Sequence, residues 1–190
     1  DDPVYVEYQD FLNYFGQEGN VVVVGFKTDS LFQLDKFNAF YTVCEDLQEV
    51  RGVEGVVSLL QAQNMVKNEK TKSFEFSPVC TGLLESEAEM LAIKTELESL
   101  PFYEDLFYNA ETKAYLMALT LNKNLLSSEK RVPLIQSIED IINPFSESIN
   151  VNVHYSGLPY IRTKSTTKTK AEVQMFIFLA MAVTALIMLL

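Results

Sequence analysis

Val21-Val22-Val23-Val24-Gly25-Phe26 is a continuous run of β-branched and apolar residues. Such a run is typical of a strand that lies in the centre of a sheet or is covered on both faces. Apolar residues then recur at steps of three and four, which predicts a helix whose apolar stripe faces the sheet. They are Leu34, Phe37, Phe40, Tyr41, Cys44 and Leu47. Gly52 ends this helix and residues 53–60 (VEGVVSLL) predict a second strand, so the first sixty residues predict one strand-helix-strand unit.

A second unit of the same kind lies near the end of the chain. Residues 114–121 (AYLMALTL) predict a strand, and residues 150–155 predict another, with apolar and polar side chains alternating as in a strand with one wet face. A helical stripe lies between them: Leu134, Ile135, Ile138, Ile141, Ile142 and Phe145. Pro133 would remove a hydrogen bond if this helix began at Ser128, so its start is distorted or later. Two such units predict an α+β fold, the ferredoxin-like split β-α-β sandwich with two helices on one face of a four-stranded antiparallel sheet.

An insertion of about residues 61–113 separates the two units within a domain that spans residues 20–156. Its length predicts structure or function of its own. Ser86-Glu87-Ala88-Glu89 has the pattern of a capping box, and an apolar stripe follows as far as Leu100, before Pro101. We therefore expect one helix here, a further strand at 102–108, and a mobile loop at 64–74.

The two ends of the chain predict attachment to a membrane. Residues 173–190 (VQMFIFLAMAVTALIMLL) carry no charge and approach the roughly 20 residues that cross a bilayer, so we expect the start of a transmembrane helix that is cut off before its end. The alternatives are a buried core helix or a recognition peptide. Residues 157–172 form a polar lead into this segment. Residues 1–19 predict an amphipathic lead helix. We expect a missing first span before it, because Asp1-Asp2-Pro3 contains no initiator methionine and does not resemble a signal peptide.

The composition excludes several classes of protein. Apolar residues make up 48% and charged residues 22% of the 190, which is typical of a folded chain. The formal net charge is -11, so a nucleic-acid backbone or an anionic membrane surface would be repelled. The two cysteines, Cys44 and Cys80, cannot make a disulfide framework and match no zinc spacing.

Three phrases resemble the resistance nodulation division superfamily of exporters, in its large-membrane-protein and patched-like branch. Residues 14–20 (YFGQEGN) resemble the passage from a first span into an external domain, residues 53–59 (VEGVVSL) the next strand, and residues 156–161 (SGLPYI) the approach to a second span. The resemblance implies a porter-type domain on the periplasmic or extracellular side of a multi-pass cytoplasmic membrane protein. It implies transport of hydrophobic or lipid-like cargo driven by ion flux, with the rest of the transporter and lipid around 173–190 as partners. We expect no cofactor, and the resemblance is compatible with a homo-oligomer.

The sequence signals for a catalytic or metal site are weak. His154 and Ser156 share one strand face, but no nucleophile motif accompanies them, so we expect no enzyme. Cys44 lies on an apolar stripe and is predicted to be a core residue, and pairing with Cys80 stays open. Two sets of three acidic residues are explained as a solvated helix face and as helix capping. Neither set has a histidine nearby in the sequence, as a typical transition-metal site would. The two sets are Glu45, Asp46 and Glu49, and Glu85, Glu87 and Glu89.

Basic and aromatic side chains remain. Four basic residues precede the apolar segment, and the positive-inside rule alone would place this side of the span in the cytoplasm. The rule compares both flanks of a span, and the second flank is missing here. We therefore expect these residues to contact lipid headgroups or to snorkel. They are Arg162, Lys164, Lys168 and Lys170. Phe102, Tyr103, Phe107 and Tyr108 could line a hydrophobic path, although such a cluster is more often core. Besides the exporter, two hypotheses stay open: a single-span anchored sensor or binding module, and a soluble enzyme on the same sandwich.

Overall fold

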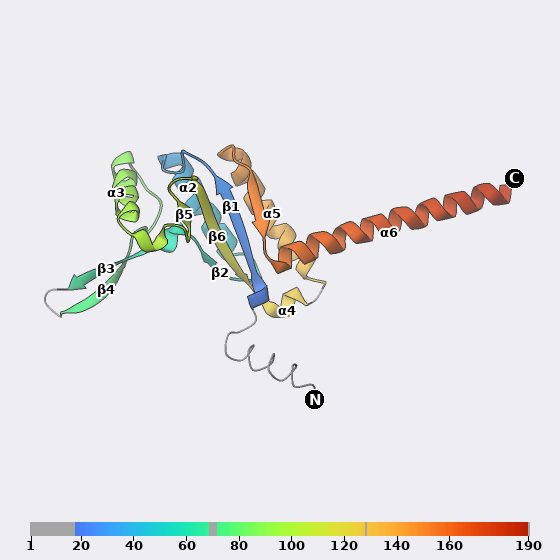
Figure 1. Cartoon of the computed structure of the whole chain (residues 1–190), viewed down its shortest axis with the longest axis horizontal. Coiled ribbons are helices and arrows are strands. Elements are labelled where there is room, and N and C mark those ends of the chain that lie inside the picture. Colours follow the sequence, from blue (N-terminus) through green and yellow to red (C-terminus); the bar gives the residue numbers. More distant parts are fainter. Residues whose placement is uncertain (1–17, 69–71, 128, 190) are drawn as a thin grey trace, which may run out of the picture.

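The structure is a computed structural model and describes residues 18–68, 72–127 and 129–189 (Figure 1). The strands are β1 (Val21–Lys27), β2 (Val53–Val57), β3 (Gln63–Asn68), β4 (Ser73–Pro78), β5 (Tyr108–Asn109), β6 (Ala114–Leu121) and β7 (Val153–Ser156). The helices are α2 (Leu34–Gln48), α3 (Glu87–Glu98), α4 (Lys123–Leu126), α5 (Arg131–Ser148) and α6 (Leu158–Leu189), with short 3-10 helices η1 (Glu18–Asn20), η2 (Leu59–Gln61) and η3 (Pro101–Tyr103). The predicted α+β class is confirmed. The lead helix predicted within residues 1–19 falls almost wholly outside the described residues.

The strands of the two predicted units interleave in one antiparallel sheet. The order is β2-β6-β1-β7, and β5 pairs with β6. Val24 in β1 lies opposite Met117 of β6 and Tyr155 of β7. β1 is therefore a central strand, as its valine run predicts.

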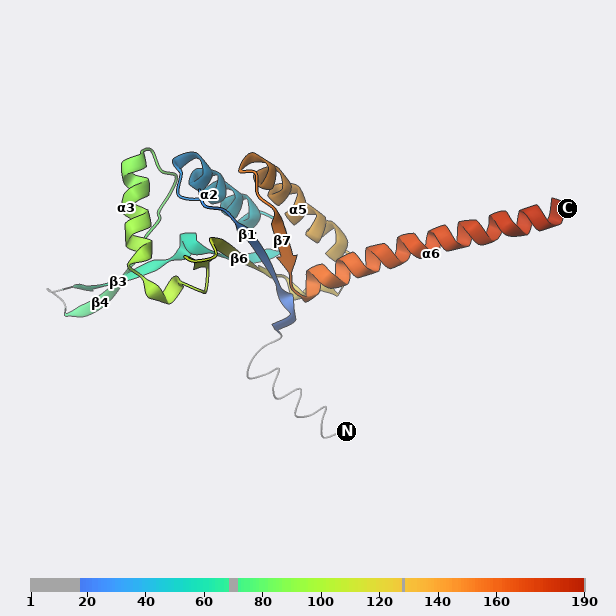
Figure 2. The ribbon, with the colours of Figure 1, turned by 45° about the horizontal axis from the view of Figure 1, so that its top comes forward.

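One face of the sheet is buried under α2 and α5 (Figure 2). Along β1, Val22, Val24 and Phe26 are buried, whereas the alternate residues are half-buried, except Lys27, which is exposed. The Phe26 ring lies 5.7 Å from Phe40 of α2 and 5.5 Å from Phe145 of α5, centroid to centroid. β1 is thus fully covered on one face only, and the core lies between the sheet and these two helices.

The helix stripe that predicted α2 forms the core as expected, with Phe37, Phe40, Cys44 and Leu47 all buried. The following strand ends earlier than predicted, at Val57 instead of Leu60. The cause is a capping box, in which the Ser58 hydroxyl accepts from the Leu60 N–H at 3.2 Å. The Ser58 N–H in turn donates to the Gln61 side chain at 2.7 Å, which turns the chain into η2.

The second unit also keeps its predicted elements with shifted ends. α5 begins at Arg131, so Pro133 lies in its first turn, where the missing N–H has no intrahelical acceptor. β7 begins at Val153, because Asn150 adopts a left-handed φ of 54° and still belongs to the turn after α5. Within β7 the predicted alternation holds, since Val153 and Tyr155 are half-buried while His154 and Ser156 are exposed.

The insertion differs most from the prediction. β3 and β4 form a separate two-stranded sheet, where the sequence predicted a mobile loop at 64–74. α3 is capped by Ser86, whose hydroxyl accepts from the Glu89 N–H at 3.3 Å. The Glu89 carboxylate accepts from Glu85 N–H instead of completing the box at Ser86. Phe102 lies in η3, and the predicted strand at 102–108 is reduced to its last residue.

The polar lead and the apolar segment form one unbroken helix, α6, which stands away from the domain on the side opposite the β3–β4 hairpin (Figures 1 and 2). No linker separates the two parts. Within the described residues, α6 is the one helix long and apolar enough to cross a membrane, and the most apolar window has no buried residues. This supports membrane association at the level of a single helix.

Candidate functional site at the base of α6

The chain passes directly from β7 into α6 through Gly157. This residue has φ +110°, and a Cβ placed on it would lie 2.2 Å from the Val21 carbonyl oxygen. Only glycine fits here, since it tolerates both the left-handed conformation and the close backbone approach. Gly157 therefore holds the start of α6 against the first residue of β1.

The chain enters the domain at the same place. η1 packs against α6, and a Cβ on Gly19 would lie 3.6 Å from the Leu158 side chain. Asn20 is buried and its amide donates to the Leu121 carbonyl at 2.9 Å, which fixes η1 to the end of β6. The segments that lead into and out of the domain are thus neighbours.

A buried carboxylate joins α6 to α5. Glu139 lies on the inner face of α5 and is 8% exposed. Its carboxylate accepts a hydrogen bond from the Tyr160 hydroxyl at 3.0 Å and pairs with the Lys164 ammonium at 2.6 Å. Tyr160 and Lys164 are four residues apart and share one face of α6. Because a buried charge needs a partner, this contact fixes both the position and the rotation of α6.

Two tyrosines extend this cluster into the sheet. The rings of Tyr155 in β7 and Tyr160 in α6 stack with centroids 4.7 Å apart and planes at 11°. The Tyr155 hydroxyl is buried and has no hydrogen-bond partner among the described residues. Burial, and then the negative charge of Glu139, raise the pKa of Tyr155 above its usual value. We refer to Glu139, Tyr155, Tyr160 and Lys164 as the joint.

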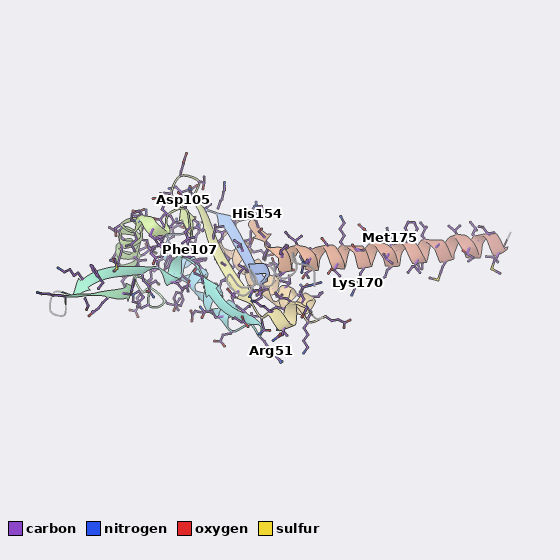
Figure 3. All side chains as sticks on the ribbon, turned by 60° about the horizontal axis from the view of Figure 1, so that its bottom comes forward. Arg51, Asp105, Phe107, His154, Lys170 and Met175 are labelled. Atoms are coloured by element: carbon purple, nitrogen blue, oxygen red, sulfur yellow. The ribbon has the colours of Figure 1, made fainter. Side chains whose placement is uncertain are left out.

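Further contacts continue the joint along the first turns of α6. Thr163 is buried and its hydroxyl donates to the Pro159 carbonyl at 2.7 Å. Arg131, at the start of α5, donates to the Thr166 hydroxyl at 3.4 Å. Beyond Thr166 every described residue of α6 is exposed. Figure 3 shows Lys170 and Met175 on this free part of the helix.

The basic residues before the apolar segment have different environments. Lys164 belongs to the joint, where it pairs with Glu139. The expected headgroup contacts of the four basic residues stay a prediction. Lys168 lies 4.0 Å from Glu172 on the same exposed helix face. Arg162 and Lys170 are exposed. The sequence missed the joint because Glu139 looks like one more polar residue of an amphipathic helix. The only available signal was its place among Ile135, Ile138 and Ile142 on the buried stripe.

The other candidates lie apart from the joint. His154 and Ser156 do share one face of β7, opposite Gly25 and Val23, but neither side chain has a hydrogen bond or an ion pair in the described part of the chain. Among residues 18–68, 72–127 and 129–189, no group of three His, Cys, Asp or Glu side chains could hold a metal ion. The six acidic residues of the two groups, at the end of α2 and at the start of α3, are all exposed.

The structure also bears on the predictions for the two cysteines and for the four aromatic residues. Cys44 is a buried core residue as predicted, and burial raises the pKa of its thiol to about 12. Cys80 is also a free, buried thiol, whose pKa is raised by burial. Of the four aromatics, Tyr108 is buried, Tyr103 and Phe107 are half-buried against the core, and Phe102 is 76% exposed, so the core interpretation holds for all but Phe102.

Comparison with protein-family models and with curated proteins gives no match for this chain. The geometry at the base of α6 is therefore the basis for a functional assignment. It provides a fixed connection between an α+β domain and a long helix with an apolar end.

Proposed function

We propose that this chain is an external domain of an ion-driven exporter of the resistance nodulation division superfamily, and that it guides or gates hydrophobic or lipid-like cargo. In this proposal the domain lies on the periplasmic or extracellular side of the cytoplasmic membrane. It moves as one body with α6, which continues into the bilayer from Val173. The remaining spans belong to the same multi-pass polypeptide.

The arrangement of the sheet supports a ferredoxin-like porter unit. The strand order β2-β6-β1-β7, with antiparallel neighbours throughout, is the order expected when two β-α-β units interleave. α2 and α5 connect the two strands of each unit and pack against each other. The β3–β4 hairpin and α3 then form the insertion between the units.

The position of the two chain ends of the domain supports a place between two membrane spans. Gly19 lies beside Leu158, and Gly157 beside Val21, so the chain enters and leaves the domain at one point. A loop domain between consecutive spans needs this proximity, because both spans must reach the same bilayer.

The joint is the observation that carries the proposal. A flexible tether would suffice to anchor a domain, whereas a transporter must convert movement of its helices into movement of its external domain. The Glu139 carboxylate, bound by Tyr160 and Lys164, and the stacked pair Tyr155–Tyr160 resist rotation of α6 against the domain.

Efflux by the parent membrane protein tests the proposal. Cells expressing the wild type should export a hydrophobic dye in a manner abolished by a protonophore. The double variant Glu139→Gln/Lys164→Met removes the ion pair without leaving one charge buried. It should lower the efflux rate by about tenfold or more at equal expression, as expected for loss of a coupling interaction of about 1.4 kcal/mol or more. The matched control Glu172→Gln/Lys168→Met removes an exposed pair and should leave efflux unchanged. Equal efflux by both variants would exclude the joint as the coupling element, and no efflux by the wild type with any lipid-like or hydrophobic cargo would contradict the exporter itself.

A single-span anchored sensor or binding module is the second candidate. It is favoured by the finding of one helix suited to cross a membrane among the described residues. Hydrophobic stretches in the remainder of the parent gene separate the two, because the exporter needs several and the anchor none.

A further inference from the structure

A cavity of about 180 Å³ lies between the domain core and the insertion, far along the chain from the joint. Its walls come from the loop after β1, from α3, and from the turn between β5 and β6. Such a volume holds several water molecules, or one small molecule of about ten non-hydrogen atoms.

Tyr115 provides a polar group that lacks a partner at this cavity. The residue is 5% exposed, and its ring stacks on Phe26 at 5.7 Å and meets the edge of Phe32 at 6.2 Å. Its hydroxyl makes no hydrogen bond to any residue in the described ranges. The hydroxyl of Tyr108, which lines the same cavity, instead donates to the Leu97 carbonyl at 3.3 Å. Tyr115 Oη is not among the buried unpartnered atoms of the described residues, which are Arg131 Nε and Tyr155 Oη. The Tyr115 hydroxyl is therefore open to the cavity and available to a molecule bound there.

The hydroxyl lies at the cavity end of the ring. Burial raises the pKa of Tyr115 to about 12, and the next largest contributions come from the carboxylates of Asp29 and Glu98, both of which line the cavity. The ring is enclosed by Phe26 and Phe32 on the core side. A molecule in the cavity would therefore meet this hydroxyl.

Charges of both signs line the same cavity. Asp29 and Glu98 contribute two carboxylates, and Lys94 and Lys113 contribute two ammonium groups. Lys94 lies 3.8 Å from Glu98 and 5.7 Å above the centre of the Phe32 ring. The local charge is thus balanced, although the whole chain carries -11. The two carboxylates would repel a purely anionic ligand, and the two ammonium groups would repel a purely cationic one. A ligand with both charges can pair with the carboxylates and with the ammonium groups.

We propose that this cavity binds a small zwitterion with an ammonium group at one end and an oxyanion at the other. Asp29 and Glu98 receive the ammonium group. Lys94, Lys113 and the Tyr115 hydroxyl receive the oxyanion. A free amino acid and an aminoalkyl phosphate, which is also a lipid headgroup, share this chemistry. Because the walls come from the core and the insertion, the bound ligand would hold α3 against the loop after β1.

Calorimetric titration of the purified full chain in detergent tests the site. The probes are glycine and O-phosphoethanolamine, with ethanolamine and inorganic phosphate as single-charge controls. At least one zwitterion should bind with a Kd below about 10 mM, a range that titration at high ligand concentration resolves, and both controls should bind at least about tenfold more weakly. Binding of glycine alone assigns a carboxylate ligand, and binding of O-phosphoethanolamine alone assigns a phosphate one.

Two conservative variants make the test specific. Tyr115→Phe removes only the hydroxyl and should weaken binding by about fivefold, the effect of one hydrogen bond, with no loss of thermal stability. Tyr103→Phe removes a hydroxyl bonded to Gln63 outside the cavity and should leave the affinity unchanged. Lys113→Gln, at an exposed position, should also weaken binding. No binding of either zwitterion, equal binding of the single-charge controls, or full affinity in Tyr115→Phe would each overturn the proposal.

Discussion

At the scale of the residue, Glu139 shows how a single charge can fix the relation of two helices. It occupies a position where an apolar side chain would otherwise continue the buried stripe of α5. A carboxylate there is tolerated only because Lys164 and Tyr160 bind it. The same requirement makes the joint specific, since no other rotation of α6 brings both groups to the carboxylate.

Removal of the Lys164 charge should therefore cost stability. Lys164→Met leaves Glu139 buried with Tyr160 as its only polar partner among the described residues. Breaking a buried ion pair costs about 3–5 kcal/mol, and the half-exposed lysine side chain reduces this to an expected loss of about 1–3 kcal/mol. Lys168→Met, which removes an exposed pair, should change the free energy of unfolding by less than about 0.5 kcal/mol. Chemical unfolding in detergent gives both values, and equal losses would contradict the role of Glu139.

The two stacked tyrosines should respond differently to loss of the hydroxyl. Tyr160→Phe removes a hydrogen bond to a carboxylate and should destabilise the protein by about 1.5–3 kcal/mol. Tyr155→Phe removes a buried hydroxyl without a partner among the described residues and should be neutral or stabilising by about 1 kcal/mol. Thermal melting of the two variants, which keep the same stacked rings, tests the assignment. A larger loss for Tyr155→Phe would show that its hydroxyl has a partner in solution.

Gly157 gives a test of the backbone at the base of α6. In Gly157→Ala the new methyl group would collide with the Val21 carbonyl at a left-handed φ, so we expect a loss of about 2 kcal/mol or more. Gly55→Ala is the matched control, because a Cβ at Gly55 meets no atom within 4 Å. The melting temperature reports both. A tolerated Gly157→Ala would mean that α6 starts in another position.

At the scale of the element, the periodic parts of the sequence predict the structure well. α2, α5, β1 and β6 follow from apolar patterns, because burial against one core imposes the period of a helix or strand on the sequence. Their ends are predicted less well, since Ser58 and Asn150 end or delay strands through local hydrogen bonds and backbone conformation. The β3–β4 hairpin was missed because its strands are exposed, so no buried face leaves a pattern.

The hairpin should accordingly contribute little to the stability of the core. Phe74 and Phe76 are 62% and 69% exposed, so Phe74→Ser or Phe76→Ser should change the free energy of unfolding by no more than about 0.5 kcal/mol. Phe40→Ala, at a fully buried ring between sheet and helix, should cost about 3–5 kcal/mol. Urea unfolding followed by circular dichroism compares them. A cooperative loss from the hairpin variants would show that the hairpin belongs to the core.

The joint was beyond sequence prediction for a different reason. Its members come from β7, α5 and α6, and only the interleaved sheet brings these elements together. The sequence placed Lys164 among four basic residues before an apolar segment, and nothing in that stretch distinguishes it from Lys168. Pairing across elements has no periodic signal.

At the scale of the whole molecule, α6 determines how the domain is placed relative to a bilayer. Its 32 residues extend about 48 Å, of which the part from Val173 onward covers about 25 Å, close to the hydrocarbon thickness. The polar part of α6, residues 158–172, lies between the domain and this apolar part, and the joint holds its first turns. The account therefore predicts a rigid stalk that carries the domain above the membrane, with the β3–β4 hairpin on the far side (Figure 1).

The most direct test of this account is the accessibility of single cysteines in the domain and along α6 in intact cells that express the parent protein, with its native cysteines replaced by serine or alanine. A membrane-impermeant maleimide should label Glu111→Cys and Lys170→Cys from outside without permeabilisation, while Phe178→Cys and Leu186→Cys should stay unlabelled until detergent is added. Labelling of Phe178→Cys in intact membranes, labelling of Glu111→Cys only after permeabilisation, or recovery of the protein in the soluble fraction would contradict it.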